Sequence, residues 1–264
     1  MFDALSIGAT GMLAQQQNVE TIANNLANAN TVAFKKGRVG FSDLMVREGN
    51  RVALAGMEES RNGTPASAQR LGAGVGIAAM SKVFEAGELK KTDSPLDLAI
   101  RGEGFLEVSM PDGSSAVTRG GTLRVKDGAL VTQAGYPLKP SIALPDNAKS
   151  LVIGADGRVL VTVPNQVNPV ELGQIEVVRF ANPGLLISLG DNLYRAGDGT
   201  GDAISARPGE DGAGSLAQGF LEASNVKMVD EMVNLMLAQR AYEASVKVVQ
   251  AADEMLGLVN NLRK

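Results

Sequence analysis

The sequence predicts an α+β fold in which two long terminal helices, paired as in a coiled coil, bracket an all-β body. Both ends carry apolar residues at helical spacing, whereas the middle consists of short alternating runs separated by turn dipeptides. The predicted helical assembly domain comprises residues 1–46 and 224–264. The body comprises residues 81–223, and residues 47–80 form an extended insert.

The first segment, residues 1–34, is predicted to be a helix that ends near the Asn28–Thr31 stretch, because Asn and Thr favour caps and turns. Its apolar residues recur at the spacing of a seam that faces another helix. They are Leu5, Met12, Val19 and Leu26, with Ile22 beside them. No charge occurs from Ala4 to Val19, although a helix facing water usually carries Lys and Glu. This face indicates close contact with neighbouring molecules; the alternative is that the two ends pack on each other in one globule.

A short segment with Phe34, Phe41 and Leu44 follows, either helical or extended. Further on, three turn signals predict β-hairpins in the body: Pro111-Asp112-Gly113, Lys126-Asp127-Gly128 and Ala155-Asp156-Gly157. Residues 123–125, 151–153, 159–163 and 174–180 read as strands. The frequent turns predict a sandwich-like or barrel-like body.

The last segment is predicted to be a helix that begins at Ser224 or Asn225, with Asp230 and Glu231 complementing the helix dipole. Its apolar residues follow a four-three alternation, and we expect them to face the first helix. They are Leu237, Ala241, Ala244, Val248, Ala251, Met255, Leu258 and Leu262.

Composition excludes several classes of function. The net charge of −4 provides no field for nucleic acid or an anionic membrane. The chain has no His and no Cys, which removes the commonest metal ligands and nucleophiles, and no cofactor or metal site is predicted. A glycan-cleaving enzyme could use Glu103, Glu107 or Asp112, but no spacing identifies a carboxylate pair.

The N-terminus does not resemble a signal peptide, because Asp3 replaces the basic segment and residues 8–17 are too polar. No apolar run is long enough to span a membrane. These features alone suggest a cytoplasmic protein, but a non-Sec export route would leave the same pattern.

Several runs resemble those of the flagellar rod, hook and hook-associated proteins. Residues 22–35 resemble the N-terminal signature, and residues 222–226, 231–233 and 239–243 resemble the C-terminal one. Residues 97–105, 116–121, 192–194 and 218–222 resemble elements of the body. Within the family, the length, the Gln239–Glu243 run and the Asn192–Tyr194 element are most similar to the members that form the distal rod. Ala33 stands where the family usually has Gly, so the turn must avoid a positive φ or tolerate it at a cost.

The resemblance implies a structural protein and not an enzyme: a subunit that polymerises helically into a rigid hollow drive shaft, transmits torque and conducts exported subunits. The insert at residues 47–80 would then be specific to the rod. Implied partners are further copies of the chain, proximal rod and hook proteins, the ring proteins at the peptidoglycan and outer membrane, and the flagellar export apparatus. The implied location is the periplasmic rod, reached without a cleaved signal. Alternatives are a proximal rod or hook-family paralogue, or a cap or binding module that does not polymerise.

The residues expected to mediate subunit assembly lie in the two terminal signatures and helices. They are Leu5, Met12, Val19, Ile22, Asn24, Asn25, Leu26, Asn28, Phe34, Asn225, Val226, Leu237, Gln239, Arg240, Tyr242, Val248, Met255, Leu258 and Leu262. The three asparagines of the first helix would form hydrogen bonds within or between subunits, or alternatively cap the helix end. Tyr242 would pack its ring while its hydroxyl finds a polar partner, although an ordinary core tyrosine is an equal alternative.

Overall fold

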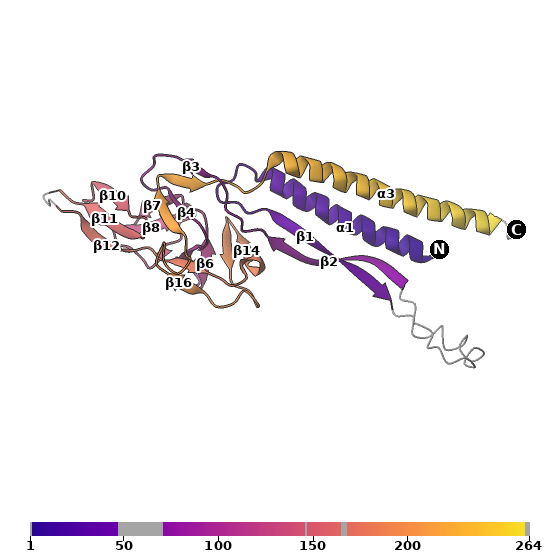
Figure 1. The fold of residues 1–264 in the computed structure, drawn as a ribbon, viewed down its shortest axis with the longest axis horizontal. Coiled ribbons are helices and arrows are strands. Elements are labelled where there is room, and N and C mark those ends of the chain that lie inside the picture. The colour runs from indigo at the N-terminus through magenta and orange to yellow at the C-terminus, as the bar shows by residue number, and fades with distance from the viewer. Residues whose placement is uncertain (1, 47–70, 146, 165–167, 262–264) are drawn as a thin grey trace, which may run out of the picture. The chain divides into compact units, whose positions relative to one another are not determined.

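A computed structural model describes residues 2–46, 71–145, 147–164 and 168–261 of the chain (Figure 1). The chain forms two compact units. Unit 1 consists of Met1–Asn24, Arg38–Met80 and Val229–Lys264, and unit 2 of Asn25–Gly37 and Ser81–Met228. A helix near each end and a β-rich body between them in sequence confirm the α+β class. Residues 47–70 of the predicted insert lie outside the described residues, and residues 71–80 belong to a strand.

Two helices dominate unit 1: α1 (Phe2–Ala27) and α3 (Met228–Asn261). They run side by side in opposite directions, so that both chain ends lie at the same end of the pair (Figure 1). Helix α1 ends earlier than the predicted residue 34. The chain turns there because Thr31 Oγ1 donates a 3.1 Å hydrogen bond to Asn28 Oδ1 and because Ala33 adopts a left-handed φ of 57°.

The segment after α1 is extended rather than helical. Strand β1 (Gly37–Val46) pairs with β2 (Leu71–Lys82) in a two-stranded sheet. The Val75 N–H donates a 3.4 Å hydrogen bond to Thr10 Oγ1 of α1. Unit 1 therefore packs two helices and one hairpin together (Figure 1).

The three predicted hairpins of unit 2 are confirmed. Their strands are β5 (Leu106–Ser109) with β6 (Ser115–Thr118), β7 (Leu123–Lys126) with β8 (Ala129–Thr132), and β10 (Ser150–Ile153) with β11 (Arg158–Thr162). Each pair is antiparallel and encloses one of the three Asp-Gly turns. Short-range turn chemistry is sufficient to specify these connections.

The predicted strand at residues 174–180 is divided between two sheets. Strand β12 (Val170–Gln174) pairs with β11, whereas β13 (Val177–Arg179) pairs with β16 (Ile204–Ala206). The other strands are β3 (Leu89–Lys91), β4 (Leu98–Arg101), β9 (Leu138–Lys139), β14 (Ile187–Gly190), β15 (Leu193–Arg195), β17 (Ser215–Gln218) and β18 (Phe220–Glu222). A short 3-10 helix, η1 (Pro183–Leu185), precedes β14. The largest sheet has the order β14-β15-β6-β5-β9, while β17 pairs with β4 and β18 with β3.

Two hydrophobic clusters fill unit 2. The larger one includes Leu98, Leu106, Val108, Leu130 and Val159, and it draws side chains from most of the sheets. The smaller cluster contains Phe105, Val117, Leu186 and Tyr194, with Phe84 and Phe180 packed against it. Because the sheets are small, these shared clusters hold them together as one body.

Candidate assembly site

Helices α1 and α3 meet through small residues. A Cβ atom added to Gly8 would lie 2.6 Å from Val249 Cγ2, and one added to Gly11 would lie 3.3 Å from Ser245 Oγ. On α3, Ala238 and Ala252 are buried and Ser245 lies between them at half burial. These three residues recur every seven positions, as at a helix seam. Their small size allows the two backbones to approach closely.

The buried stripe of α3 is not the predicted one. It lies one residue further along the chain, which corresponds to a rotation of about 100° around the helix. The large apolar residues that we expected to face α1 are instead exposed: Leu237 is 60%, Val248 51%, Met255 47% and Leu258 64% exposed. The periodicity of the sequence predicts a helix seam, but it does not indicate which of two adjacent stripes is buried. The stripe with the smaller side chains gives the closer helix contact.

On α1, the predicted apolar residues lie closer to expectation. Ile22 is buried, and Leu5, Met12, Val19 and Leu26 are half-buried. On α3, Gln239, Arg240 and Tyr242 are exposed. Leu262 lies outside the described residues. Among the residues that the structure describes, an apolar and polar surface of α3 is therefore left exposed.

The predicted asparagines form hydrogen bonds within the chain. The Asn25 side chain accepts from Gly37 N at 2.7 Å and donates to Gly37 O at 2.9 Å, which closes the loop after α1. Asn28 accepts from Thr31 in the local turn, as in the capping alternative. Asn24 is exposed. These contacts assign Asn25 and Asn28 a local role in shaping the end of α1.

Asn225 connects the two signatures inside unit 2. Its Oδ1 accepts from Lys36 N at 2.8 Å, and its Nδ2 donates to Val83 O at 2.8 Å. The Lys82 ammonium lies 4.4 Å from the ring centre of the buried Phe34 and donates to Lys35 O. Nearby, Val226 N donates to Ser224 Oγ at 3.2 Å. We call this region, where residues 33–36 meet residues 82–88 and 222–225, the joint. Helix α3 begins at Met228 rather than at Ser224 or Asn225, because the Asn225 side chain is engaged in the joint.

A buried ion cluster lies at the same joint. Lys35 Nζ is 2.6 Å from Glu222 Oε1, and Arg119 Nε is 2.7 Å from Glu222 Oε2. The three side chains are 0%, 2% and 1% exposed for Lys35, Arg119 and Glu222 respectively. Lys35 comes from the N-terminal signature, Arg119 from the body, and Glu222 from the C-terminal signature.

Each of the three side chains of this cluster has further partners. Lys35 Nζ donates to Glu85 O at 2.6 Å, and Gly87 N donates to Glu222 Oε1 at 2.8 Å. Arg119 donates to the carbonyls of Gly104 at 2.8 Å, Gly102 at 2.9 Å and Ile100 at 3.2 Å. Such complete pairing is the condition under which buried charges are tolerated.

Two cations face one carboxylate in this cluster. Burial alone raises the pKa of Glu222, but the charges of Arg119 and Lys35 outweigh it and hold the pKa below its ordinary value. Burial lowers the pKa of Lys35, and Glu222 opposes that effect. Glu222 is therefore the ionised centre around which the joint is built.

The aromatic cluster packs beside these charges. Tyr194 makes an edge-to-face contact with Phe84 at 5.0 Å, and Phe84 makes one with Phe105 at 5.1 Å. Burial, with a smaller contribution from Glu222, raises the pKa of Tyr194 to about 12. Asn192 donates to Val32 O at 2.7 Å, so the Asn192–Tyr194 element connects the body to the turn after α1.

Ala33 does not avoid a positive φ but tolerates it, which is the second of the two alternatives considered from the sequence. Its φ is 57°, it is fully buried, and its N–H donates to Glu222 O at 2.8 Å. A non-glycine residue in this region costs roughly 1–2 kcal/mol. The joint tolerates that cost because its other contacts hold the turn in place.

Each of the three carboxylates considered for catalysis interacts with a different partner. Glu103 pairs with Arg179 at 3.0 Å and Glu107 with Lys139 at 2.9 Å. Asp112 accepts two hydrogen bonds from Ser114 in a turn, which lowers its pKa. They do not form a pair of the kind that glycan hydrolysis uses.

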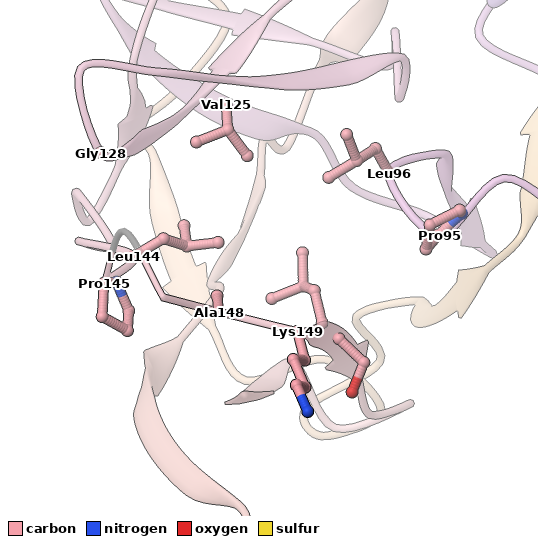
Figure 2. A pocket seen from close by; sticks show the side chains of 10 residues that line it. Pro95, Leu96, Val125, Gly128, Leu144, Pro145, Ala148 and Lys149 are labelled. Atoms are coloured by element: carbon pink, nitrogen blue, oxygen red, sulfur yellow. The ribbon is translucent and has the colours of Figure 1, made fainter. Parts of the chain in front are cut away.

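An open hollow of about 490 Å³ lies in unit 2. Figure 2 shows Leu96, Val125 and Leu144 pointing into it, while the Lys149 ammonium points away. The hollow therefore offers chiefly apolar contact. Over the ranges that the structure describes, no group of three or more acidic residues is placed to hold a metal ion. Likewise, neither described helix is apolar enough over sufficient length to cross a membrane.

The joint contains three residues that lie in the motifs given above but are not among the predicted assembly residues. The sequence places Lys35, Arg119 and Glu222 in family signatures but does not indicate a role for them. The available signal was a charged residue next to large apolar ones, as in Phe34-Lys35 and Phe220-Leu221-Glu222. That pattern indicates a charge directed inward, but it does not identify the partner.

Three family profiles match the chain. The profile "Flagella basal body rod protein" matches residues 5–35, "Flagellar hook protein FlgE/F/G D1 domain" residues 99–161, and "Flagellar basal body rod FlgEFG protein C-terminal" residues 217–262. They cover the two terminal segments and the first half of the body, which together contain all three members of the ion cluster.

Full-length relatives agree with these matches. The "Flagellar basal-body rod protein FlgG" of Borreliella burgdorferi is 43% identical over 100% of both chains. In Bacillus subtilis, FlgG is 36% identical and the "Flagellar hook-basal body complex protein FlhP" 30% identical, again over 100% of each chain. The chain therefore belongs to the family of flagellar basal-body rod proteins, and it is a structural protein of the basal body and not an enzyme.

Proposed function

We propose that the chain is the subunit of the distal part of the rod and that it polymerises helically into a rigid, hollow shaft. The shaft transmits torque and conducts exported subunits. The higher identity to FlgG than to FlhP of the same bacterium supports this assignment over a paralogue. The observation that carries the polymerisation is the exposed apolar stripe of α3.

This stripe is suited to contact with other copies of the chain. Leu237, Val248, Met255 and Leu258 are exposed although α1 already covers another side of α3. Fully burying such a side chain stabilises by about 1.5–3 kcal/mol, so covering several of them at once supplies a large driving force. Arg240 is exposed about 60° around the helix from Leu237 and provides a polar contact beside the stripe, whereas Gln239 and Tyr242 are exposed on the other side of α3.

The helices gain much of their stability from assembly in this proposal. The closest contact between the two helices is made by small residues, Gly8, Gly11, Ala238 and Ser245, while several large apolar side chains of α3 stay exposed. Helical stability in proteins comes largely from burying an apolar face, so the ends of a free monomer should be only partly ordered. Assembly then couples their folding to binding.

The uncharged part of α1 is proposed to line the passage of the shaft. Within this region Asn18 Nδ2 donates to Gln15 Oε1 at 3.5 Å, and Gln16 Nε2 donates to Glu20 Oε1, just beyond the region, at 3.1 Å. From Ala4 to Val19 no side chain is charged. Such a surface would let unfolded chains slide past without electrostatic attachment.

The partners follow from this position in the basal body. We propose proximal rod and hook proteins as axial neighbours, the peptidoglycan-level and outer-membrane ring proteins around the shaft, and the flagellar export apparatus as the route out. The site would be the periplasmic rod, reached without a cleaved signal peptide.

The experiment compares Val248→Lys with Gln250→Lys in the purified full-length chain. Both positions are exposed on α3, but they lie about 160° apart around the helix, so only the first charge falls on the stripe. We expect helical tubes in electron micrographs of the wild type and of Gln250→Lys, and none of Val248→Lys at the same concentration. Tubes from Val248→Lys at the wild-type critical concentration would remove the stripe from the interface. A wild type that binds rod proteins without polymerising would favour a cap.

A further inference from the structure

The ion cluster brings together three parts of unit 2 that are far apart in sequence. Lys35 lies in the segment Asn25–Gly37, Arg119 follows strand β6, and Glu222 ends strand β18. Lys35 and Glu222 are separated by 187 positions, and Arg119 and Glu222 by 103. The joint therefore depends on contacts of very high sequence separation.

No two of these parts complete the cluster. Glu222 Oε1 accepts from Lys35 and Gly87, and Glu222 Oε2 accepts from Arg119. If Glu222 is absent, two buried cations lie together without a counter-charge. If Lys35 is absent, Glu222 Oε1 and Glu85 O each lose a donor. Absence of Glu222 therefore leaves buried cations without a counter-charge. Absence of Lys35 removes a charged donor from two acceptors, which keep Gly87 N and Asn225 Nδ2 respectively. Both changes are unfavourable.

Backbone contacts link the same parts. Ala33 N donates to Glu222 O and Asn225 N to Phe34 O, while Val83 N donates to Lys36 O. Ala223 N donates to Glu88 O at 2.8 Å. Opening one part thus removes partners from the others.

We propose that Lys35, Arg119 and Glu222 form a latch that orders residues 25–37 and residues 222–226 in a single all-or-none step. The chain emerges from synthesis with its N-terminus first, so Lys35 is present long before Glu222. The latch therefore closes only when the C-terminal signature has arrived, and the segments that lead into the two terminal helices become ordered together. In a rod subunit, a role that rests on the proposed function, the latch would keep the segments next to the two terminal helices from becoming ordered in an incomplete chain.

Native-state hydrogen exchange of the wild-type monomer tests the latch without any substitution. The amides of Ala33, Gly87 and Ala223 report on the N-terminal segment, the Glu222 carboxylate and the C-terminal segment respectively. We expect all three to show one opening free energy and one denaturant dependence, as members of one cooperative unit do. Separate openings for Ala33 and Ala223 would overturn the proposal. Tube formation is not measured, so failure of the proposed function would remain distinguishable.

A pair of matched lysine variants gives the second test. Lys35→Met removes one cation of the latch, whereas Lys139→Met removes a half-exposed lysine whose partner is Glu107, outside the latch. We expect Lys35→Met to lower exchange protection at Ala33, Gly87 and Ala223 together by about 100-fold. Lys139→Met should change the protection of all three amides by less than about threefold.

A loss of protection confined to Ala33 in Lys35→Met would contradict the latch, because the two segments would then open independently. The amide of Val108 in the body core reports whether the variant has unfolded as a whole. If Val108 loses protection to the same degree, the wild-type experiment alone decides the question.

Discussion

Lys35 and Glu222 lie 187 positions apart in the sequence, yet the Lys35 ammonium donates a 2.6 Å hydrogen bond to the Glu222 carboxylate. Neither side chain is more than 1% exposed. Residues from both terminal signatures thus meet inside the body unit, where Arg119 completes their charges. The signatures serve the internal joint of each chain as well as the proposed contacts between chains.

Replacing Glu222 by Gln should destabilise unit 2 strongly. The amide keeps the shape of the side chain but leaves Lys35 and Arg119 as buried cations without a counter-charge, which costs about 3–5 kcal/mol. Chemical denaturation followed by circular dichroism measures the change. Glu107→Gln is the control, because it removes the more exposed pair with Lys139 and should cost about 1 kcal/mol or less.

The same carboxyl should make stability depend on acid. The pKa of Glu222 is lower in the folded chain than its ordinary value of 4.5, so the unfolded state binds its proton first as the pH falls. The contribution is complete above pH 4.5 and is lost progressively below it. The free energy of unfolding of the wild type should therefore decrease more steeply in this range than that of Glu222→Gln. Equal slopes would show that Glu222 is not held ionised.

The Tyr194 phenol should lose its proton at a higher pH than an ordinary tyrosine does. Its pKa of about 12 lies above the ordinary value of 10.0, so its phenol remains neutral at pH 11 in the folded chain. The sign is that of a raised pKa: the stability that depends on the neutral phenol is complete below pH 10 and is lost as the pH rises toward 12. The difference in absorbance at the tyrosinate band between wild type and Tyr194→Phe isolates this group. A difference that develops near pH 10 would contradict burial of the ring.

Alanine substitutions at two helical glycines should distinguish the effect of helix packing on stability from the effect of helix propensity. Gly8→Ala should weaken the pairing of α1 and α3, because the new Cβ would lie 2.6 Å from Val249 Cγ2. Gly257→Ala is the control, since nothing lies within 4 Å of its Cβ position. Both gain about 0.5–1 kcal/mol of helix propensity, so their difference reports the clash, which typically costs about 1–3 kcal/mol. The melting temperature of the assembled protein should fall for Gly8→Ala and hold or rise for Gly257→Ala.

Helix content should depend on protein concentration. If the exposed stripe of α3 is covered by other copies, mass action makes both the helical signal and the melting temperature rise with concentration. Circular dichroism at several concentrations measures this, and Val248→Lys should abolish the dependence. A wild type whose ends are fully helical when dilute, with a melting temperature independent of concentration, would contradict assembly-coupled ordering.

The sequence was sufficient to predict the elements whose signals are local. The three Asp-Gly turns specify their hairpins because the turn residues select the backbone conformation. The two terminal helices follow from their apolar spacing. The end of α1 was placed too late, because the side-chain contact between Asn25 and Gly37 that closes its loop is not visible in periodicity.

The rest depended on contacts between distant residues. Leu237 and Ala238 belong to adjacent stripes with the same period, and the choice between them is made by the glycines of α1. Gln174–Phe180 alternates like one strand, yet Gln174 and Val177 pair with different sheets. Lys35 was visible as a charge beside Phe34, but its partner Glu222 could be named only once the fold had brought the two together.

The chain crosses between its two units four times, at residues 24–25, 37–38, 80–81 and 228–229. On the body side, hydrogen bonds join Asn25 to Gly37, Lys36 to Val83, and Asn225 to both Lys36 and Val83. Within unit 2, these hydrogen bonds connect the segments next to the crossing points with one another. Tension that enters unit 2 at any one of these points would load several hydrogen bonds together rather than a single stretch of backbone.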